Sequence, residues 1–201
     1  MRIRIGPVLD NPAFFPEQGD WHNLTEPSFG LLMALSIPTG LLLGIGLLAA
    51  WAAVAGVRGV EDAGQVIITP VTVLVSIVAF VALVIAHEAA HAVILPRGEL
   101  ALRTTIGFWP EKLTPYVSYE GELSRNRTIL VGLMPFVLLS LVPVLIGLLF
   151  GWMPLWLVLL STVNAVVSSA DVIGAVLVAV QIPPSAVVRK KGLETWWRRQ
   201  A

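Results

Sequence analysis

The chain of 201 residues contains no cysteine, only three histidines and few charged residues. Without cysteine, neither disulfides nor thiolate metal sites are available. Charged residues make up 13% of the sequence, whereas soluble domains contain about 25%. Because 56% of the residues are hydrophobic, this shortage of charge indicates an integral membrane protein.

Two further absences narrow the function. The formal net charge is zero and no basic stripe with interleaved aromatic residues is present, so we expect no nucleic-acid partner. The first 28 residues contain no compact apolar core followed by a small-residue cleavage site, so we predict no signal peptide. Of the partners considered, the apolar composition thus indicates the lipid bilayer and not a nucleic acid.

Four apolar runs are long enough to cross a bilayer core, which needs about 20 helical residues. They cover roughly residues 29 to 57, 68 to 95, 128 to 150 and 152 to 180. Pro38 lies in the first run and should kink that helix or delay its start. We therefore predict an all-α integral membrane protein with four transmembrane helices.

Charge asymmetry predicts the orientation of these spans. Four spans place both termini and the 96 to 127 loop on one side of the membrane. That side carries all but one of the lysines and arginines, and the opposite side carries only Arg58. By the positive-inside rule both termini are cytoplasmic, as we expect for a protein of a prokaryotic-type cell membrane.

The polar segments flank a transmembrane domain at residues 29–180. Residues 1–28 are expected to be a cytoplasmic or interfacial segment, and residues 181–201 a basic tail whose tryptophans suit the headgroup layer. In the cytoplasmic loop, "LRTTIGFW" and "YVSYEG" are rich in β-branched and aromatic residues and are separated by "PEKLTP". This pattern predicts a short β-hairpin, whose edge could bind an unwound peptide as an added strand. An ordinary connector that lies on the headgroups is the alternative interpretation.

The segment "FVALVIAHEAAHAVIL", residues 80–95, places three polar side chains in the second span. His87 and His91 are four residues apart, so they share one helical face and both imidazoles can reach one ion. With Glu88 they form the H-E-x-x-H pattern, in which the histidines bind zinc and the glutamate is a general base. Haem ligation is a rival use, but the remaining histidine, His22, lies outside the spans.

A catalytic zinc site usually has a third protein ligand. His22 lies far away in sequence, and Glu111 follows a stretch rich in glycine and proline that argues against a packed helix, so we expect Glu111 at the surface. Asp171 is the stronger candidate, because it is the only acidic residue in the last two spans. A lone carboxylate bonded to neighbouring helices remains the alternative interpretation of Asp171.

Spacing and charge favour Asp171 as the partner of the histidines. Asn164, Ser168 and Asp171 are spaced by four and three residues and share a helical face. Asp171 and His87 each follow about 19 residues of helix from the outer end of their spans, so they should lie at similar depth. The charge of one Zn²⁺ is balanced by the carboxylates of Asp171 and Glu88, while the two histidines are neutral. No buried charge of this group is then left uncompensated.

Three segments together resemble a known family. "HEAAH", the loop "YEGELSRNRTILVGLMPF" and "NAVVSSAD" are similar to the zincin-type peptidases grouped as the DUF3267 family, distant relatives of site-2 intramembrane proteases. The resemblance covers about residues 68 to 185. It implies one zinc ion per chain, bound by His87, His91 and Asp171, with Glu88 as base, and peptide-bond cleavage in or near the membrane. The site-2 protease pattern N-P-D-G is not present here.

These observations predict a zinc metallopeptidase acting on a peptide or membrane-protein substrate. Glu88 would transfer the proton, and Asn164 would take a catalytic role by donating to the oxyanion or holding the substrate backbone. Ser168 would orient Asp171. The alternative is a non-catalytic metal-binding scaffold or a metal or proton transporter, which would have no need of Glu88.

Overall fold

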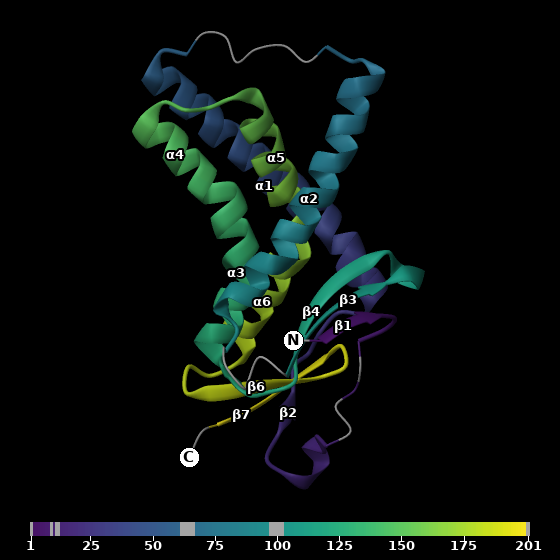
Figure 1. Cartoon of the computed structure of the whole chain (residues 1–201). Helices are drawn as coiled ribbons and strands as arrows, with labels where there is room; N and C mark the ends of the chain where they lie inside the picture. Colours follow the sequence, from purple (N-terminus) through teal and green to yellow (C-terminus); the bar gives the residue numbers. More distant parts are fainter. Residues whose placement is uncertain (1, 9, 11–12, 61–66, 97–102, 200–201) are drawn as a thin grey trace. The chain divides into compact units, whose positions relative to one another are not determined.

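A computed structural model describes residues 2–8, 10, 13–60, 67–96 and 103–199 of the chain (Figure 1). Its contacts divide the chain into two compact units. The sheet unit contains Met1–Ser28, Glu88–Leu133 and Ile173–Ala201, and the helical unit contains Phe29–His87 and Met134–Val172. Three helices, α2, α3 and α6, contribute residues to both units.

The apolar runs form helices close to the predicted bounds. They are α1 (Phe29–Arg58), α2 (Pro70–Ile94), α3 (Arg125–Phe136), a π-helical turn (Val137–Leu141), α4 (Val142–Phe150), α5 (Leu155–Val167) and α6 (Ser169–Gln181). Three helices are long and apolar enough to cross a membrane: α1, α2 and the stretch Arg125–Phe150. The bent pair α5 and α6 would be a fourth if it is one span, so three to four of the predicted spans have helices that could cross a membrane.

Pro38 lies inside α1, which begins nine residues earlier at Phe29. The predicted late start of this helix is therefore wrong. Proline removes one backbone donor, yet membrane helices tolerate it because neighbouring groups satisfy the freed carbonyl.

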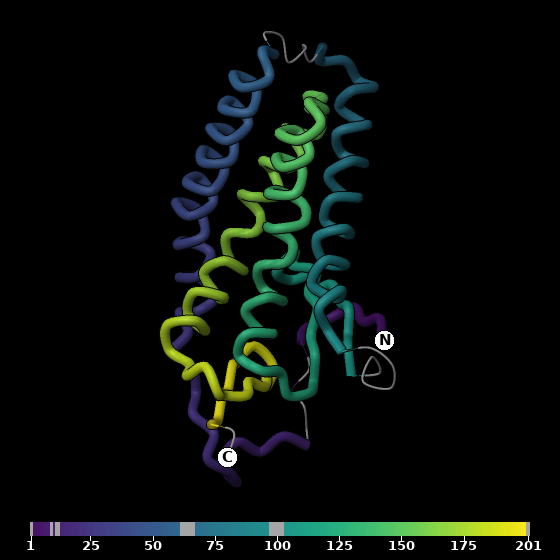
Figure 2. The backbone as a smooth tube through the Cα atoms, turned by 90° about the vertical axis from the view of Figure 1, so that its left-hand side faces the viewer, coloured from purple at the N-terminus to yellow at the C-terminus, as the bar shows by residue number. Residues whose placement is uncertain are grey.

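Close packing of α1 against α5 builds the core of the helical unit. Leu47, Trp51 and Ala165 form a buried cluster, and the Trp51 Nε1 donates to Ser161 Oγ at 3.0 Å. Gly44 lets the helices approach, because a Cβ there would lie 2.9 Å from Val166 Cγ2. Figure 2 shows these helices as neighbouring tubes.

The first sheet contains the hairpin that the sequence predicted. Strand β3 (Thr104–Trp109) pairs antiparallel with β4 (Thr114–Tyr119), and the short 3-10 helix Pro110–Lys112 lies in the connection. Strand β1 (Arg2–Ile5) adds in parallel to the other edge of β3. The hairpin prediction is confirmed, and the N-terminal segment supplies its third strand.

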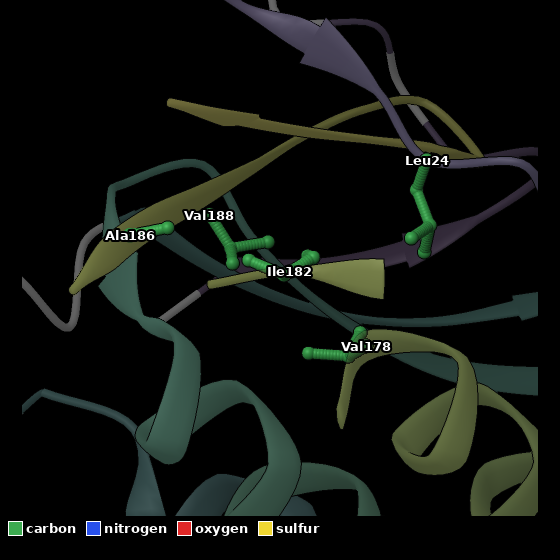
Figure 3. Close-up of a cluster of buried hydrophobic side chains, with 5 residues drawn as sticks. All are labelled: Leu24, Val178, Ile182, Ala186 and Val188. Carbon is green, nitrogen blue, oxygen red and sulfur yellow. The ribbon is translucent and has the colours of Figure 1, made fainter. Parts of the chain in front are cut away.

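The second sheet has the order β2-β7-β6-β5. It comprises β2 (His22–Asn23), β5 (Leu123–Ser124), β6 (Ala186–Lys191) and β7 (Glu194–Arg199), and its paired neighbours are all antiparallel. Its core contains Leu24 after β2, Val178 in the last turn of α6, Ile182 directly after α6, and Ala186 and Val188 of β6 (Figure 3). With two sheets in the described residues, the all-α prediction is wrong, although most of the chain is helical.

The C-terminal segment forms two strands where an interfacial tail was expected from its basic residues and tryptophans. "AVVRKK" and "ETWWRR" flank the two residues Gly192 and Leu193, and Lys191 pairs with Glu194 across the turn. Gly192 has φ +58°, a conformation that suits the first position of a two-residue II′ hairpin turn. The glycine between two runs rich in β-formers was the available sequence signal.

Candidate metal centre

The last two turns of α2 carry the H-E-x-x-H residues. His87, Glu88 and His91 form a group whose ligand atoms all lie within 4.8 Å of one another. His87 is 5% exposed and His91 9% exposed. A helix places residues i and i+4 one turn apart on one face, so this grouping follows directly from the sequence spacing.

Both ring nitrogens of His87 have partners in the helical unit. Its Nδ1 lies 3.0 Å from the Asn164 Oδ1 of α5, and its Nε2 lies 3.1 Å from the Asp171 Oδ2 in the first turn of α6. The structure therefore brings together His87, Asn164 and Asp171 from three helices.

The orientation of the Asn164 amide determines which partner donates. Its Nδ2 donates to the Pro135 carbonyl oxygen at 3.0 Å and to Ser140 Oγ at 2.9 Å. A carbonyl can only accept, so Oδ1 is the atom that faces His87. The Nδ1 of His87 is consequently the protonated nitrogen and the donor.

His91 is anchored in a similar way within the sheet unit. Its Nδ1 lies 2.7 Å from the main-chain carbonyl oxygen of Val131 on α3, and a carbonyl accepts only. Metal-binding histidines usually donate the other ring N–H to a carbonyl or carboxylate. Both histidines thus use Nδ1 as a donor, so Nε2 is the ring nitrogen that would bind a metal ion.

Irregular helix geometry supplies a partner of Asn164 and comes directly before Asp171. The π-helical turn Val137–Leu141 contains Ser140, which is 0% exposed and donates to the Ser161 carbonyl oxygen at 2.8 Å. The break between α5 and α6 bends the chain by 49° just before Asp171. π-turns and broken membrane helices occur often at functional sites.

Arginines at the start of α3 hold the ends of two helices in the sheet unit. The Arg127 Nε donates to the Ile94 carbonyl oxygen at the end of α2 at 2.7 Å. The Arg125 guanidinium donates to the Ala179 carbonyl oxygen near the end of α6 at 2.6 Å. Cations stabilise the C-terminal ends of helices, so these contacts support the end of α2 next to His91.

Glu111 and His22, which the sequence offered as other candidates for the third ligand, do not belong to the H-E-x-x-H group. Glu111 is exposed in the β3–β4 connection, where its carboxylate accepts from Trp109 Nε1 at 3.0 Å, so the prediction of a surface residue is confirmed. His22 is exposed in β2 and packs on Trp197 with ring centroids 4.8 Å apart.

Ser168 donates to the carbonyl oxygen of Asn164 at 2.8 Å. Sequence analysis missed three groups that contact Asn164 or His91: Ser140 and the carbonyls of Pro135 and Val131. Every residue has a main-chain carbonyl, so no sequence signal distinguishes the carbonyls of Pro135 and Val131 from the others in the chain.

The donor set fits zinc. Two imidazoles and a carboxylate are ligands that Zn²⁺ takes in catalytic sites, with bonds of about 2.0–2.2 Å. Two such ligands on one tetrahedral ion lie about 3.3 Å apart, close to the 3.1 Å between His87 Nε2 and Asp171 Oδ2. A zinc ion at this place would replace the proton that His87 Nε2 and the Asp171 carboxyl group share in this hydrogen bond.

The arrangement defines a class: a helical protein with membrane-length apolar helices and a zincin-type H-E-x-x-H site. The sequence profile of DUF3267, a family described as "Putative zincin peptidase", matches residues 80–187, more than half of the chain. The chain belongs to this family. No curated protein and no solved structure matched the chain.

Proposed function

We propose that the chain is an intramembrane zinc metallopeptidase that hydrolyses peptide bonds in or near the membrane. The observation that carries the proposal is the state of the two histidines of H-E-x-x-H. Each has its Nδ1 at an acceptor, Asn164 Oδ1 for His87 and the Val131 carbonyl for His91, and His87 Nε2 faces Asp171. Two imidazoles one helical turn apart, each with its Nδ1 at an acceptor, match the way in which metal-binding histidines are usually held.

In this proposal His87, His91 and Asp171 hold one zinc ion per chain. Zinc in such a site activates a water molecule and polarises the scissile carbonyl. Two neutral histidines and the carboxylates of Asp171 and Glu88 balance the charge of the ion. An ionised carboxylate in a membrane helix costs about 2.5 to 3.5 kcal/mol on insertion scales, and this balance offsets that cost.

Glu88 is the proposed general base. It follows His87 directly in α2 and belongs to the compact group of ligand atoms. Its carboxylate would accept a proton from the attacking water and return it to the leaving amine. Neither a structural clamp nor a carrier of metal ions has a need for this proton transfer.

The membrane location rests on the apolar helices and on the distribution of charge. The H-E-x-x-H residues lie near the end of α2, before the loop between the second and third spans, which carries five of the 13 lysines and arginines. The proposed orientation thus places the metal centre on the cytoplasmic side of the bilayer midplane, with both termini cytoplasmic.

The edge of the first sheet suits a substrate that binds as an extended peptide segment. Strand β4 is at an edge of the described sheet, because β3 pairs with β1 on its other side. An exposed edge can bind a peptide through main-chain hydrogen bonds with little dependence on sequence. We propose that unwound segments of peptides or membrane proteins bind there.

The metal content of the detergent-purified protein tests the proposed function. Inductively coupled plasma mass spectrometry should find about one zinc per chain in wild type, and a large loss of zinc in Asp171→Ala. Glu111→Ala, which removes an exposed carboxylate of the β3–β4 connection, should keep its zinc. A folded wild-type protein that takes up no zinc after reconstitution would contradict the proposal.

A further inference from the structure

Asn164 is enclosed by polar partners although it lies in an apolar helix. Its side chain is 0% exposed, and its Nδ2 lies within hydrogen-bond distance of the Pro135 carbonyl oxygen, Ser140 Oγ and Ser168 Oγ. Its Oδ1 lies 3.0 Å from His87 Nδ1. Both ends of the amide are therefore occupied by groups of the protein itself.

The amide cannot be reversed without loss. Turning it by 180° would place Oδ1 against the Pro135 carbonyl oxygen and Nδ2 against His87. Two oxygen acceptors would then face each other in a buried site, and a buried unsatisfied polar group costs about 1–3 kcal/mol. The neighbours of Asn164 thus select the orientation in which its oxygen accepts from His87.

The π-helical turn is the rigid support for this orientation. Ser140 accepts from Asn164 Nδ2 at 2.9 Å and donates its own proton to the Ser161 carbonyl oxygen at 2.8 Å. Because the hydroxyl proton is directed at that carbonyl, the Ser140 oxygen is left as an acceptor for Asn164. The chain of donors and acceptors runs from Ser161 through Ser140 and Asn164 to His87.

We propose that Asn164 is a positioning residue that keeps the proton of His87 on Nδ1 and so presents Nε2 to the metal, and that it makes no contact with substrate. This role rests on the proposed zinc-dependent function. It differs from a catalytic role, in which the Nδ2 would donate to the oxyanion or the substrate backbone. In the structure the Nδ2 is directed instead at Pro135 and Ser140.

The first test reads the histidine protonation directly in chelator-treated, metal-free protein. The chain has three histidines, so ¹⁵N labelling of histidine with His22→Gln and His91→Gln as assignment controls should identify the ring signals of His87. Wild type should show a protonated Nδ1 with slow exchange with water. Asn164→Ala should shift the proton toward Nε2 or expose it to fast exchange. An unprotonated Nδ1 in wild type, or an unchanged signal in Asn164→Ala, would overturn the inference.

The second test measures the dissociation constant for zinc by competition with a chelator. Asn164→Ala should weaken zinc binding about 10- to 100-fold, as the loss of such supporting hydrogen bonds commonly does. Asn164→Asp, which keeps an oxygen acceptor for His87, should recover part of the affinity. Ser161→Ala is the matched control, because it removes the buried hydroxyl that accepts from Trp51 one turn earlier and keeps the carbonyl that Ser140 uses.

The two tests separate the inference from the proposed function. Absence of zinc from folded wild type would reject the zinc peptidase, while the ¹⁵N signals would still decide whether Asn164 holds the proton on Nδ1. Equal losses of zinc affinity in Asn164→Ala and Ser161→Ala would mean that Asn164 acts only through general stability, and would reject the positioning role.

Discussion

At the scale of single residues, the two histidines of the motif differ in what supports them. His87 donates to a side chain, Asn164, whereas His91 donates to the main-chain carbonyl of Val131. Substitution can remove the first acceptor but not the second. The support of His87 is therefore the part of the metal centre that mutation can adjust.

Glu88 distinguishes hydrolysis from a metal-binding scaffold. Glu88→Gln removes the carboxylate that would accept the proton but keeps a side chain of similar size. We expect zinc content near that of wild type and a loss of cleavage rate of at least about 100-fold, within the range of general-base effects. Cleavage of fluorescein-labelled casein and of a panel of transmembrane peptides in detergent would measure it, with Glu111→Gln as control. Turnover like that of wild type in Glu88→Gln would exclude the hydrolytic mechanism.

At the scale of elements, the contact between α1 and α5 depends on small residues. In Gly44→Leu the new side chain must enter the space of Val166, because even its Cβ would lie 2.9 Å from Val166 Cγ2. Overpacking of this kind costs about 1–3 kcal/mol. We expect a lower unfolding midpoint in detergent titrated with sodium dodecyl sulfate, followed by circular dichroism.

Gly46 of the same helix provides the matched control for that substitution. A Cβ at Gly46 meets no atom within 4 Å, and Gly46→Leu raises helix propensity as much as Gly44→Leu does. Its midpoint should equal or exceed that of wild type. Equal midpoints for the two variants would show that α1 and α5 do not pack closely at Gly44.

The turn of the C-terminal hairpin is a second test at this scale. Gly192 has φ +58°, a region that β-branched residues rarely adopt. Gly192→Val should destabilise the sheet unit, because β6 and β7 form the middle of the second sheet. Limited proteolysis should cut this variant within the C-terminal segment at lower protease concentration than Leu193→Val. Equal resistance of the two variants would contradict the turn assignment.

At the scale of the whole molecule, the two ends of the chain belong to the same unit. Strand β2 pairs with β7, and the Glu26 carboxylate accepts from the Thr195 amide and hydroxyl, both at 2.9 Å. Gln181 adds hydrogen bonds to Thr25 in both directions at 3.1 Å. These contacts hold the N-terminal and C-terminal segments together, which agrees with the proposal that both termini are cytoplasmic.

The absence of cysteine makes the proposed topology directly testable. In spheroplasts that express the chain, we expect a membrane-impermeant maleimide to label Ile67→Cys, which is 72% exposed before α2. Leu193→Cys, 50% exposed in the C-terminal turn, should react only after permeabilisation. The positive-inside rule predicts this difference. Labelling of Leu193→Cys in intact spheroplasts would place the C-terminus outside.

Sequence alone was sufficient for the helices and for the local part of the metal centre. A span needs about 20 apolar residues, so the apolar runs determine how many helices can cross the membrane. The pairing of His87 with His91 needs only helical periodicity. The β3–β4 hairpin also follows from local composition, because its two strands are close in sequence.

Only the tertiary structure decided what surrounds those residues. The acceptors of the two Nδ1 atoms, the π-turn that places Ser140, and the joining of β2 to β7 all depend on segments far apart in the chain. Local periodicity does not encode such contacts, and a carbonyl such as that of Val131 exists at every residue. The sequence therefore determined which groups are candidates to bind a metal ion, and the packing of distant helices decided which nitrogen of each histidine has an acceptor.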